Sequence, residues 1–514
     1  MPRWDDGYVT DVTYTDNVFR EMTPAWLALT ALLLGQCPPD LSRPFRYADL
    51  GCGHGMTALF VAASCPQAEV WGFDFNPAHI AAARQYASQV GLSNITFVET
   101  SFADLAAQPA AALPEFDFIV SHGVLSWISP ANQKLLVEVI RQRLRAGGLA
   151  YVSYNTLTGW ASMVPVRALM HLLAEAGTER SDQAALTTLD LMERVRATGA
   201  RFFTQHPDLQ ERLATLRKQN PRYLAHEFLN ADWHPLMCAD VMAAMAEARC
   251  EYIGSAALAE NIDVASVPAE LAPMLAQYRD PRIRETLRDI GMAGAFRRDV
   301  YRRGVVPLLP QEQVRLLERL RFTRIGPLPE ADVSFATPIG TLNGRPEVYQ
   351  PLLALLRQGP VTLGELHRAD PARSWGEVVQ ALSLLTGGGQ VHPMLPEPAA
   401  GAATARALNE WISDVNADGG DMPRLVAPAI GSMIAADLLE TFVAGHLLRG
   451  AAPVAEPLAD QVLAQLRSAG RSLQRDGQTL HDPAEARQHT IGLVRTVLTN
   501  RVPLLRDLGI LPQG

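Results

Sequence analysis

The sequence is poor in lysine and in net positive charge. Only Lys134 and Lys218 occur among 45 basic residues, and the formal net charge is -9. Proteins that bind nucleic acid usually carry a basic patch or stripe, and this balance gives none, so we expect no nucleic-acid partner. The preference for arginine, beside 37 glycines and 36 prolines, is typical of a GC-rich genome rather than of a function.

Paired cysteines and a secretion signal are also missing. The cysteines form no CxxC pair and have no metal-ligand spacing, so we expect no metal site and reduced thiols in a cytoplasmic protein. The first residues, MPRWDDGYVTD, are acidic and lack the apolar segment of a secretory signal. The five cysteines are Cys37, Cys52, Cys65, Cys238 and Cys250.

No apolar stretch is long and uninterrupted enough to suit a membrane. The most apolar run, LVAPAIGSMIAADLLETFVAGHLL from Leu425, contains Pro428, Asp437 and Glu440. These interruptions favour a buried pair of helices over membrane insertion. With 514 residues, 48% of them apolar, the chain is long enough for three or four domains.

Strand and helix patterns alternate through the first third of the chain. Such alternation predicts an α/β fold with a parallel sheet covered on both faces. Residues 162–229 then read as helical throughout, and the strand–helix rhythm returns at 238–256 and 295–304. We expect strands at 45–50, 68–75, 94–100, 116–123 and 149–155, and helices at 56–65, 77–91 and 132–148.

The character of the sequence changes after residue 305. Residues 333–396 contain a hairpin-like TPIGTLNGR, a helix SWGEVVQALSLLTGG and a strand QVHPML, an order that is winged-helix-like. Residues 402–514 read as amphipathic helices broken by Gly and Pro. We therefore expect a Rossmann-like sheet with a helical insertion, then a winged-helix-like middle domain and a helical C-terminal domain.

The stretch DLGCGHG, residues 49–55, places three glycines directly after the first expected strand. Its spacing is GxGxG, because Met56 stands where a dinucleotide fingerprint needs glycine. GxGxG after the acidic Asp49 is the pattern of S-adenosylmethionine (SAM) binding. SAM lacks a pyrophosphate but has a ribose diol, and Asp74, at the end of the second strand, is placed to accept both hydroxyls.

Residues after the third and fourth strands complete the expected cofactor site. Ser101 stands where an acidic residue often contacts adenine, so its hydroxyl or the Phe102 amide would make that contact; alternatively Ser101 only caps a loop. His122 follows the fourth strand, near the place of the sulfonium methyl, or is simply packed there. The cofactor-binding residues we expect are Asp49, Gly51, Cys52, Gly53, Gly55, Asp74, Phe75, Ser101, Phe102 and His122.

Four further segments carry a specific pattern: SHGVLSW (121–127), YVSYNTLTGW (151–160), YLAHEFLN (223–230) with Trp233 and Pro235, and YIGSAALAENID (252–263). They resemble bacterial methyltransferases that carry a methyltransferase regulatory domain, a group that includes the rickettsial protein-lysine methyltransferases acting on outer-membrane protein B. The resemblance is specific over 8–310 and weaker beyond. It departs at Thr158, where the family's YNxxPGW has proline.

The resemblance implies a class I methyltransferase that forms a homodimer through its helical insertion. The insertion has more apolar surface, on residues such as Leu172 and Phe202, than one edge of the sheet can cover. The division we expect is an N-terminal cap over substrate and SAM (1–40), the SAM-binding core (41–161 and 234–308), the insertion for dimerisation or as a lid (162–233), the middle domain (309–400) and the C-terminal domain (401–514).

A lysine side chain in a protein or peptide is the acceptor we expect. Its ammonium group must lose a proton, and a dry aromatic channel favours that loss. His122 is a candidate catalytic residue near the methyl group. Asn155 could hold the amine, and the pair His226–Glu227 could accept the proton or orient the substrate. The candidate aromatic residues are Tyr14, Trp127, Tyr154, Trp160 and Tyr223.

Other reactions fit the sequence less well. SHGV replaces the [DNS]PP[YF] motif of amino-methylating DNA enzymes, no Pro-Cys dipeptide supplies a cytosine nucleophile, and no acidic cluster suits metal-assisted O-methylation. Two alternatives stay open: a methyltransferase for a metabolite or peptide, as in natural-product tailoring, and a SAM-binding regulator without turnover.

Overall fold

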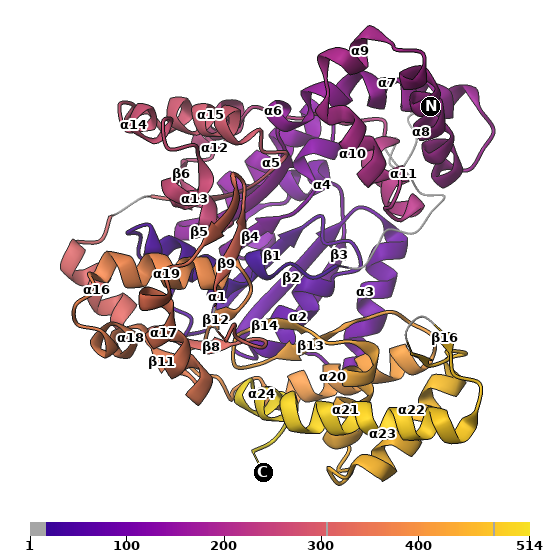
Figure 1. The fold of residues 1–514 in the computed structure, drawn as a ribbon. Helices are drawn as coiled ribbons and strands as arrows, with labels where there is room; N and C mark the ends of the chain where they lie inside the picture. The colour runs from indigo at the N-terminus through magenta and orange to yellow at the C-terminus, as the bar shows by residue number, and fades with distance from the viewer. Residues whose placement is uncertain (1–16, 305–306, 331, 476–477, 514) are drawn as a thin grey trace.

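The computed structural model describes residues 17–304, 307–330, 332–475 and 478–513. Its centre is a seven-stranded sheet in the order β3-β2-β1-β4-β5-β7-β6 (Figure 1). The first five of these strands are parallel, and β7 runs antiparallel to both β5 and β6. The strands are β1 (Phe45–Leu50), β2 (Ala68–Asp74), β3 (Ile95–Glu99), β4 (Phe116–Ser121), β5 (Leu144–Asn155), β6 (Cys250–Ser255) and β7 (Phe296–Arg303).

Short helices connect the parallel strands and begin where the sequence places capping residues. Asn76, Ser101 and Ser129 each accept a backbone N–H at a helix start, and a proline follows two of them in the first turn. The helices are α2 (Met56–Ser64), α3 (Pro77–Val90), α4 (Phe102–Ala107) and α5 (Pro130–Arg143). The predicted Rossmann-like α/β fold is confirmed, and its strand order reverses between β1 and β4.

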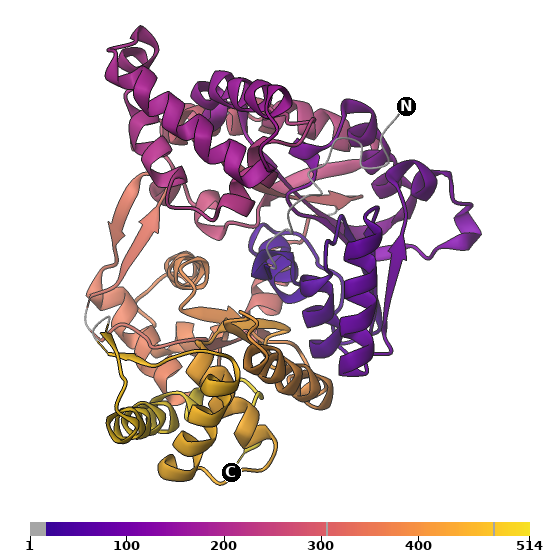
Figure 2. The same cartoon turned by 90° about the vertical axis from the view of Figure 1, so that its right-hand side faces the viewer.

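Six helices lie between β5 and the helix that leads to β6, and Figure 2 shows them together at the top of the molecule. They bury a core of their own that includes Met163, Met170, Leu189 and Phe228. They are α6 (Leu157–Trp160), α7 (Val164–Ala176), α8 (Ser181–Ala197), α9 (Arg201–Gln205), α10 (Asp208–Leu216) and α11 (Pro221–Phe228). The chain then returns to the sheet through α12 (Cys238–Glu247), β6, α13 (Asp263–Ser266), α14 (Ala272–Leu275) and α15 (Pro281–Met292).

The segment after the sheet domain packs against the N-terminal helix. Arg20, in a 3₁₀ turn before α1 (Pro24–Leu33), donates to the Gly387 carbonyl at 3.0 Å, and Trp26 contacts His392. Strand β8 pairs with both β11 and β12. The elements are α16 (Pro310–Arg319), β8 (Arg321–Arg324), β9 (Ser334–Thr337), β10 (Gly340–Asn343), α17 (Pro346–Gln358), β11 (Val361–Thr362), α18 (Leu363–Ala369), α19 (Trp375–Gly387) and β12 (Val391–Pro393).

The C-terminal region is not purely helical. The apolar run from Leu425 forms a hairpin and one helix, not the pair of helices that its composition predicts, because Pro428 and Gly431, whose φ is +63°, turn the chain back on itself. Among the described residues, no helix is both long and apolar enough to cross a membrane. The elements are α20 (Ala402–Ala417), β13 (Arg424–Ala427), β14 (Ser432–Ala435), α21 (Leu438–Leu448), α22 (Ala455–Ser468), β15 (Gln474–Arg475), β16 (Gln478–Thr479), α23 (Pro483–Asn500) and α24 (Val502–Asp507).

Helix α20 joins this C-terminal region to the sheet domain. Trp411 contacts the Tyr86 ring on α3 and donates to the Gln89 side chain at 2.9 Å, while Thr404 donates to the Ala63 carbonyl on α2. One hydrophobic cluster runs without a break from the sheet into these later segments. Removal of residues 311–514 would therefore uncover apolar surface on the sheet domain itself.

Candidate active site

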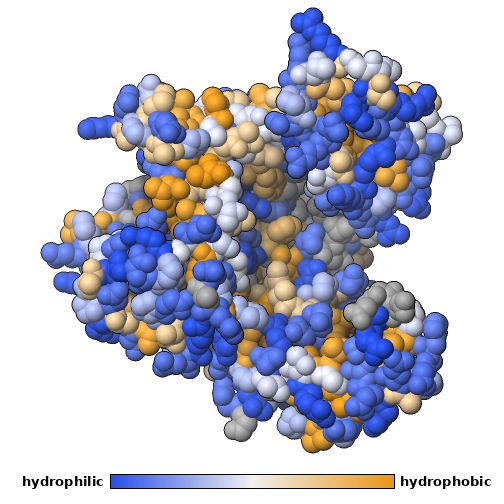
Figure 3. All heavy atoms as spheres, viewed as in Figure 1, coloured by the Kyte–Doolittle hydropathy of each residue, from blue (hydrophilic) through white to orange (hydrophobic). Residues whose placement is uncertain are grey.

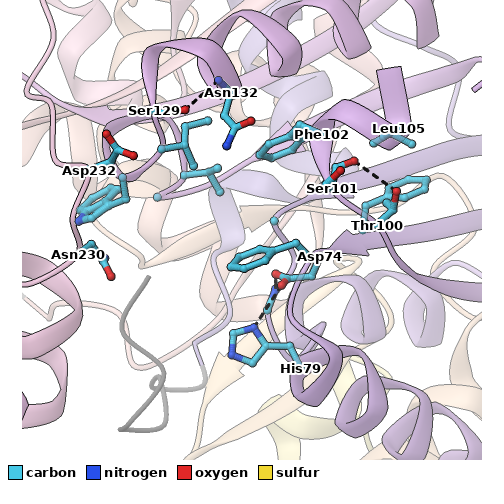
Figure 4. A pocket seen from close by; sticks show the side chains of 18 of the residues that line it. Asp74, His79, Thr100, Ser101, Phe102, Leu105, Ser129, Asn132, Asn230 and Asp232 are labelled. Carbon is cyan, nitrogen blue, oxygen red and sulfur yellow. Dashed lines mark hydrogen bonds and ion pairs between the residues drawn. The ribbon is translucent and has the colours of Figure 1, made fainter. Parts of the chain in front are cut away.

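A cavity of about 520 Å³ opens at the carboxyl ends of the parallel strands, where the strand order reverses. Ligands of open α/β sheets bind at such a switch point, and the volume suits a small-molecule ligand. The surface is hollowed between the insertion helices and the C-terminal region (Figure 3). Inside the cavity, Asn230 and Asp232 lie across from Thr100, Ser101 and Phe102 (Figure 4).

The three glycines of DLGCGHG are required for different reasons. Gly51, Gly53 and Gly55 all have positive φ, which favours glycine. A Cβ on Gly51 would meet the Val124 side chain, and one on Gly55 would meet the Phe97 ring. Only at Gly53 would a Cβ extend into open space, so this position alone leaves room for a ligand beside the backbone.

Asp74 lines the cavity at the end of β2 and is 8% exposed. One of its carboxylate oxygens accepts the Gly53 N–H at 2.8 Å, and the other accepts the Asn76 N–H at 2.9 Å. The His79 imidazole approaches within 3.4 Å (Figure 4). These contacts hold the carboxylate in one orientation and leave lone pairs for a ribose diol, so the residues present fit a bound SAM.

A smaller cavity of about 80 Å³ lies beneath the glycine loop and shares four wall residues with the larger one. Asp49 and Cys52 line it. Burial, with the charge of Asp74 added, raises the pKa of Asp49 to about 8. Burial also raises the pKa of the Cys52 thiol, so both groups favour their protonated forms when no ligand is bound.

Phe75, Ser101 and Phe102 line the side of the cavity formed by the ends of β2 and β3. The Ser101 hydroxyl accepts the Asp104 N–H at 3.0 Å and donates to the Asp104 carboxylate at 2.8 Å, so it caps α4. Phe75 and Phe102 are the aromatic residues among these three. Of the two hypotheses for Ser101 that the sequence allows, these contacts support the helix cap.

His122 stands where the two cavities meet and lines both. Its Nδ1 lies 2.8 Å from the Tyr151 hydroxyl and 3.2 Å from the Ser153 hydroxyl, and Phe19 stacks on its ring at 3.7 Å. Burial, together with the nearby Arg298 guanidinium, lowers the pKa of His122 to about 3. The imidazole is therefore neutral near pH 7.

The opposite end of the cavity is formed by α11 and the turn after β4. His226, Glu227 and Trp127 line it. Asn155 donates its side-chain N–H to Glu227 at 3.2 Å rather than facing the cavity, and the Trp127 indole donates to the Glu227 carbonyl at 3.3 Å. Burial raises the pKa of Glu227 to about 7, although hydrogen bonds from Asn155 and Tyr223 oppose the rise.

Several aromatic residues expected in the channel wall lie elsewhere. Tyr154 is fully buried and donates to Asp299 at 2.7 Å, Trp160 packs in the insertion core and donates to the Ala295 carbonyl, and Tyr223 reaches the cavity only through Glu227. Tyr14 lies outside the described residues. Thr158, which replaces the family's proline, is 3.5 Å from the Gly294 carbonyl, beside the Trp160 anchor.

Other cavity residues were not anticipated. Asn132 follows the Ser129 cap of α5, and Asn230 and Asp232 follow Glu227 within five residues of the chain. The polar residues of HEFLNAD (226–232) could have indicated these cavity residues, but the sequence does not show which of the side chains point into the cavity. Among the described residues, no group of three or more His, Cys, Asp or Glu side chains is placed to hold a metal ion.

Known proteins share this architecture and these segments. Residues 48–150 match the family described as a methyltransferase domain, and residues 220–303 match the predicted methyltransferase regulatory domain. The structure of PKMT2 from Rickettsia typhi in complex with AdoHcy has the same fold, with a TM-score of 0.74 at 19% identity over 97% of this chain and 99% of its own. Fold and cavity together define a class I SAM-dependent methyltransferase.

Two sequence relatives show to which family the chain belongs. An uncharacterized protein of Synechocystis sp. is 35% identical over 511 residues, which is 99% of both chains. The trans-aconitate 2-methyltransferase of Streptomyces coelicolor is 29% identical over 175 residues, 32% of this chain and 54% of its own. The chain belongs to the SAM-dependent methyltransferases that carry the predicted methyltransferase regulatory domain.

Proposed function

We propose that the protein methylates the side-chain amine of lysine in a protein or peptide. The observation that carries this proposal is the charge of the cavity. Five carboxylates line it, and no Lys or Arg does so among the described residues. Such a wall attracts a cation and repels an anion. The carboxylates belong to Asp74, Glu99, Asp104, Glu227 and Asp232.

Glu227 is suited to receive the proton that the acceptor must lose. Lysine has a reference pKa of about 10.4, so its ammonium form dominates near pH 7 and has no lone pair for attack. A carboxylate with a pKa of about 7 is a good general base at that pH. When SAM is bound it supplies the methyl group; Glu227 accepts the proton, and Trp127 and the surrounding wall exclude water. Asn155 acts through Glu227 by holding its carboxylate.

The resemblance to the rickettsial protein-lysine methyltransferases supports the same acceptor. The trans-aconitate 2-methyltransferases point to a different one, because their named substrate carries three carboxylates. A carboxylate acceptor would need cationic partners, and no Lys or Arg lines the cavity among the described residues. The charge of the cavity therefore favours the amine.

The test uses tritiated SAM and the double variant Lys134→Arg/Lys218→Arg. Both lysines are exposed, and without them the enzyme cannot label itself on lysine. Label should enter protein in an untreated bacterial lysate, should be lost when the lysate's amines are acetylated beforehand, and should map to lysine side chains. Label on oxygen, or only in small molecules or added trans-aconitate, would overturn the lysine proposal. SAM binding without any transfer would favour the regulator.

We also propose that the protein is a cytoplasmic homodimer that docks its protein substrate near this cavity. The five cysteines form no disulfide, which suits a reducing compartment. On the insertion, Leu172 is 60% exposed, whereas Phe203 is buried within the chain, so less apolar surface is left for a partner than the sequence suggested. Light scattering at micromolar concentration, with Leu172→Glu as the variant, tests the dimer: a monomer would count against it.

A further inference from the structure

The hydroxyls around His122 determine which of its two nitrogens carries the proton. Gly123 donates its N–H to the Ser153 hydroxyl oxygen at 2.9 Å, and the hydroxyls of Ser153 and Tyr151 lie within hydrogen-bond distance of Nδ1. Ser153 and Tyr151 also contact each other. Tyr151 and Ser153 both lie on β5 and are fully buried, and burial raises the pKa of the Tyr151 phenol, which keeps its proton.

Counting protons in this cluster leaves one consistent state of Nδ1, which must be a hydrogen-bond acceptor. If Nδ1 carried the proton, it would donate to Tyr151, Tyr151 would donate to Ser153, and the Ser153 proton would have no acceptor in the cluster. If Nδ1 is the acceptor, both hydroxyl protons are satisfied. Tyr151 is the donor to Nδ1 because its hydroxyl is nearer, at 2.8 Å against 3.2 Å for Ser153, and Ser153 then donates to Tyr151. The neutral ring then carries its proton on Nε2, the nitrogen turned away from β5.

The cofactor has one anionic group, the carboxylate of its amino-acid part, which needs hydrogen-bond donors. The amides of Gly51 and Cys52 already donate to the Phe73 carbonyl, and the Gly53 amide donates to Asp74. No Lys or Arg lines either cavity among the described residues. Asp49, beneath the loop, suits the ammonium group of the same part.

We propose that His122 donates its Nε2 proton to the carboxylate of bound SAM, and that Tyr151 is the positioning residue that fixes this tautomer. His122 is then a cofactor-binding residue and not the base of the reaction, since its Nε2 already holds a proton and its Nδ1 is occupied. The inference rests on the cofactor alone and is independent of which acceptor is methylated.

The experiment measures binding, by calorimetry, of SAM and of decarboxylated SAM, which lacks only the carboxylate. Wild type should prefer SAM by roughly tenfold, the effect of one charge-assisted hydrogen bond. His122→Ala should abolish most of this preference, and His122→Gln, which keeps an N–H donor, should restore part of it. Tyr151→Phe should reduce the preference several-fold without weakening decarboxylated SAM.

Tyr47→Phe is the matched control, because Tyr47 is equally buried on the same sheet and its hydroxyl has no hydrogen-bond partner among the described residues. It should leave the preference unchanged. Nitrogen-15 spectra, assigned through the His122 variants, should show a single Nε2–H form in wild type and a mixture in Tyr151→Phe. Equal affinity of wild type for the two cofactors, a preference that survives His122→Ala, or an Nδ1–H form would overturn the proposal. None of these outcomes bears on the lysine acceptor.

Discussion

The two ends of the cavity are assembled in different ways. At the cofactor end, Gly53, Asp74 and Phe102 sit at the ends of adjacent strands β1, β2 and β3, each a few residues from the glycine or cap that shapes it. At the end where we propose that the methyl acceptor binds, here called the acceptor end, Glu227 comes from the insertion and is held by Asn155, 72 residues earlier in the chain, and by Trp127, 100 residues earlier. The first end depends on local turns and the second on the docking of a separate helical unit.

The two ends also differ in their electrostatics. His122, between the cavities, is held neutral by burial with a pKa near 3, whereas burial brings the pKa of Glu227 to about 7. A group of the first kind keeps one protonation state at any physiological pH, and a group of the second kind changes state near pH 7. The cofactor end should therefore bind in a constant way while the acceptor end carries the pH dependence of transfer.

The largest effect should come from Glu227→Gln. Loss of a general base lowers methyl transfer by roughly 10²–10⁴-fold, while SAM affinity should stay within about twofold because the carboxylate lies at the other end of the cavity. Single-turnover transfer and calorimetry measure the two quantities. Asp232→Asn, which removes a charge from the same wall but not the proposed base, is the control; equal losses in both variants would mean that charge alone matters.

Asp74→Ala should act mainly on SAM affinity. It removes a buried carboxylate that also holds the Gly53 and Asn76 amides, so SAM affinity should fall at least about tenfold. NADH should not bind wild type, because the loop lacks the dinucleotide spacing. The exposed Asp104, on the same wall, gives the control Asp104→Asn, for which we expect about a twofold change at most. Calorimetry that finds unchanged SAM affinity in Asp74→Ala would refute the assignment.

Sequence spacing is a good guide to the first end and a poor one to the second, for physical reasons. Residues that directly follow adjacent parallel strands lie at the same edge of the sheet, so the sequence alone predicts that Gly53 and Asp74 lie close together, and the structure places both on one cavity wall. Tyr154 and Asn155 are adjacent in the chain, yet alternation along β5 turns one toward Asp299 and the other toward Glu227. The partner of each is set by tertiary packing, which spacing does not encode.

Glycine substitutions separate folding from binding within the loop itself. Gly55→Ala would force a Cβ into the Phe97 ring, and Gly53→Ala would place one in open space beside the cofactor cavity, with only the strain of a positive φ. We expect thermal unfolding to show a loss of about 1–3 kcal/mol for Gly55→Ala and about 1 kcal/mol or less for Gly53→Ala. SAM affinity should fall in the still-folded Gly53→Ala. If the two variants were equally unstable, the different roles assigned to the glycines would be wrong.

A pH-dependent change in stability is also expected at the acceptor end. The pKa of Glu227 rises from 4.5 to about 7 on folding, so between these values the folded state holds a proton that the unfolded state has lost. The contribution of Glu227 to stability is therefore fully present below about pH 4.5 and is lost as the pH rises through about 7, a loss on the order of 3 kcal/mol. The side chain introduced in Glu227→Gln cannot ionise, so this variant should not lose that stability. Its melting temperature should match wild type near pH 5 and exceed it by a few degrees at pH 8. Since all other groups are common to both proteins, a difference that stays constant with pH would show that Glu227 does not titrate in this range, and would leave the acceptor end without the base proposed for it.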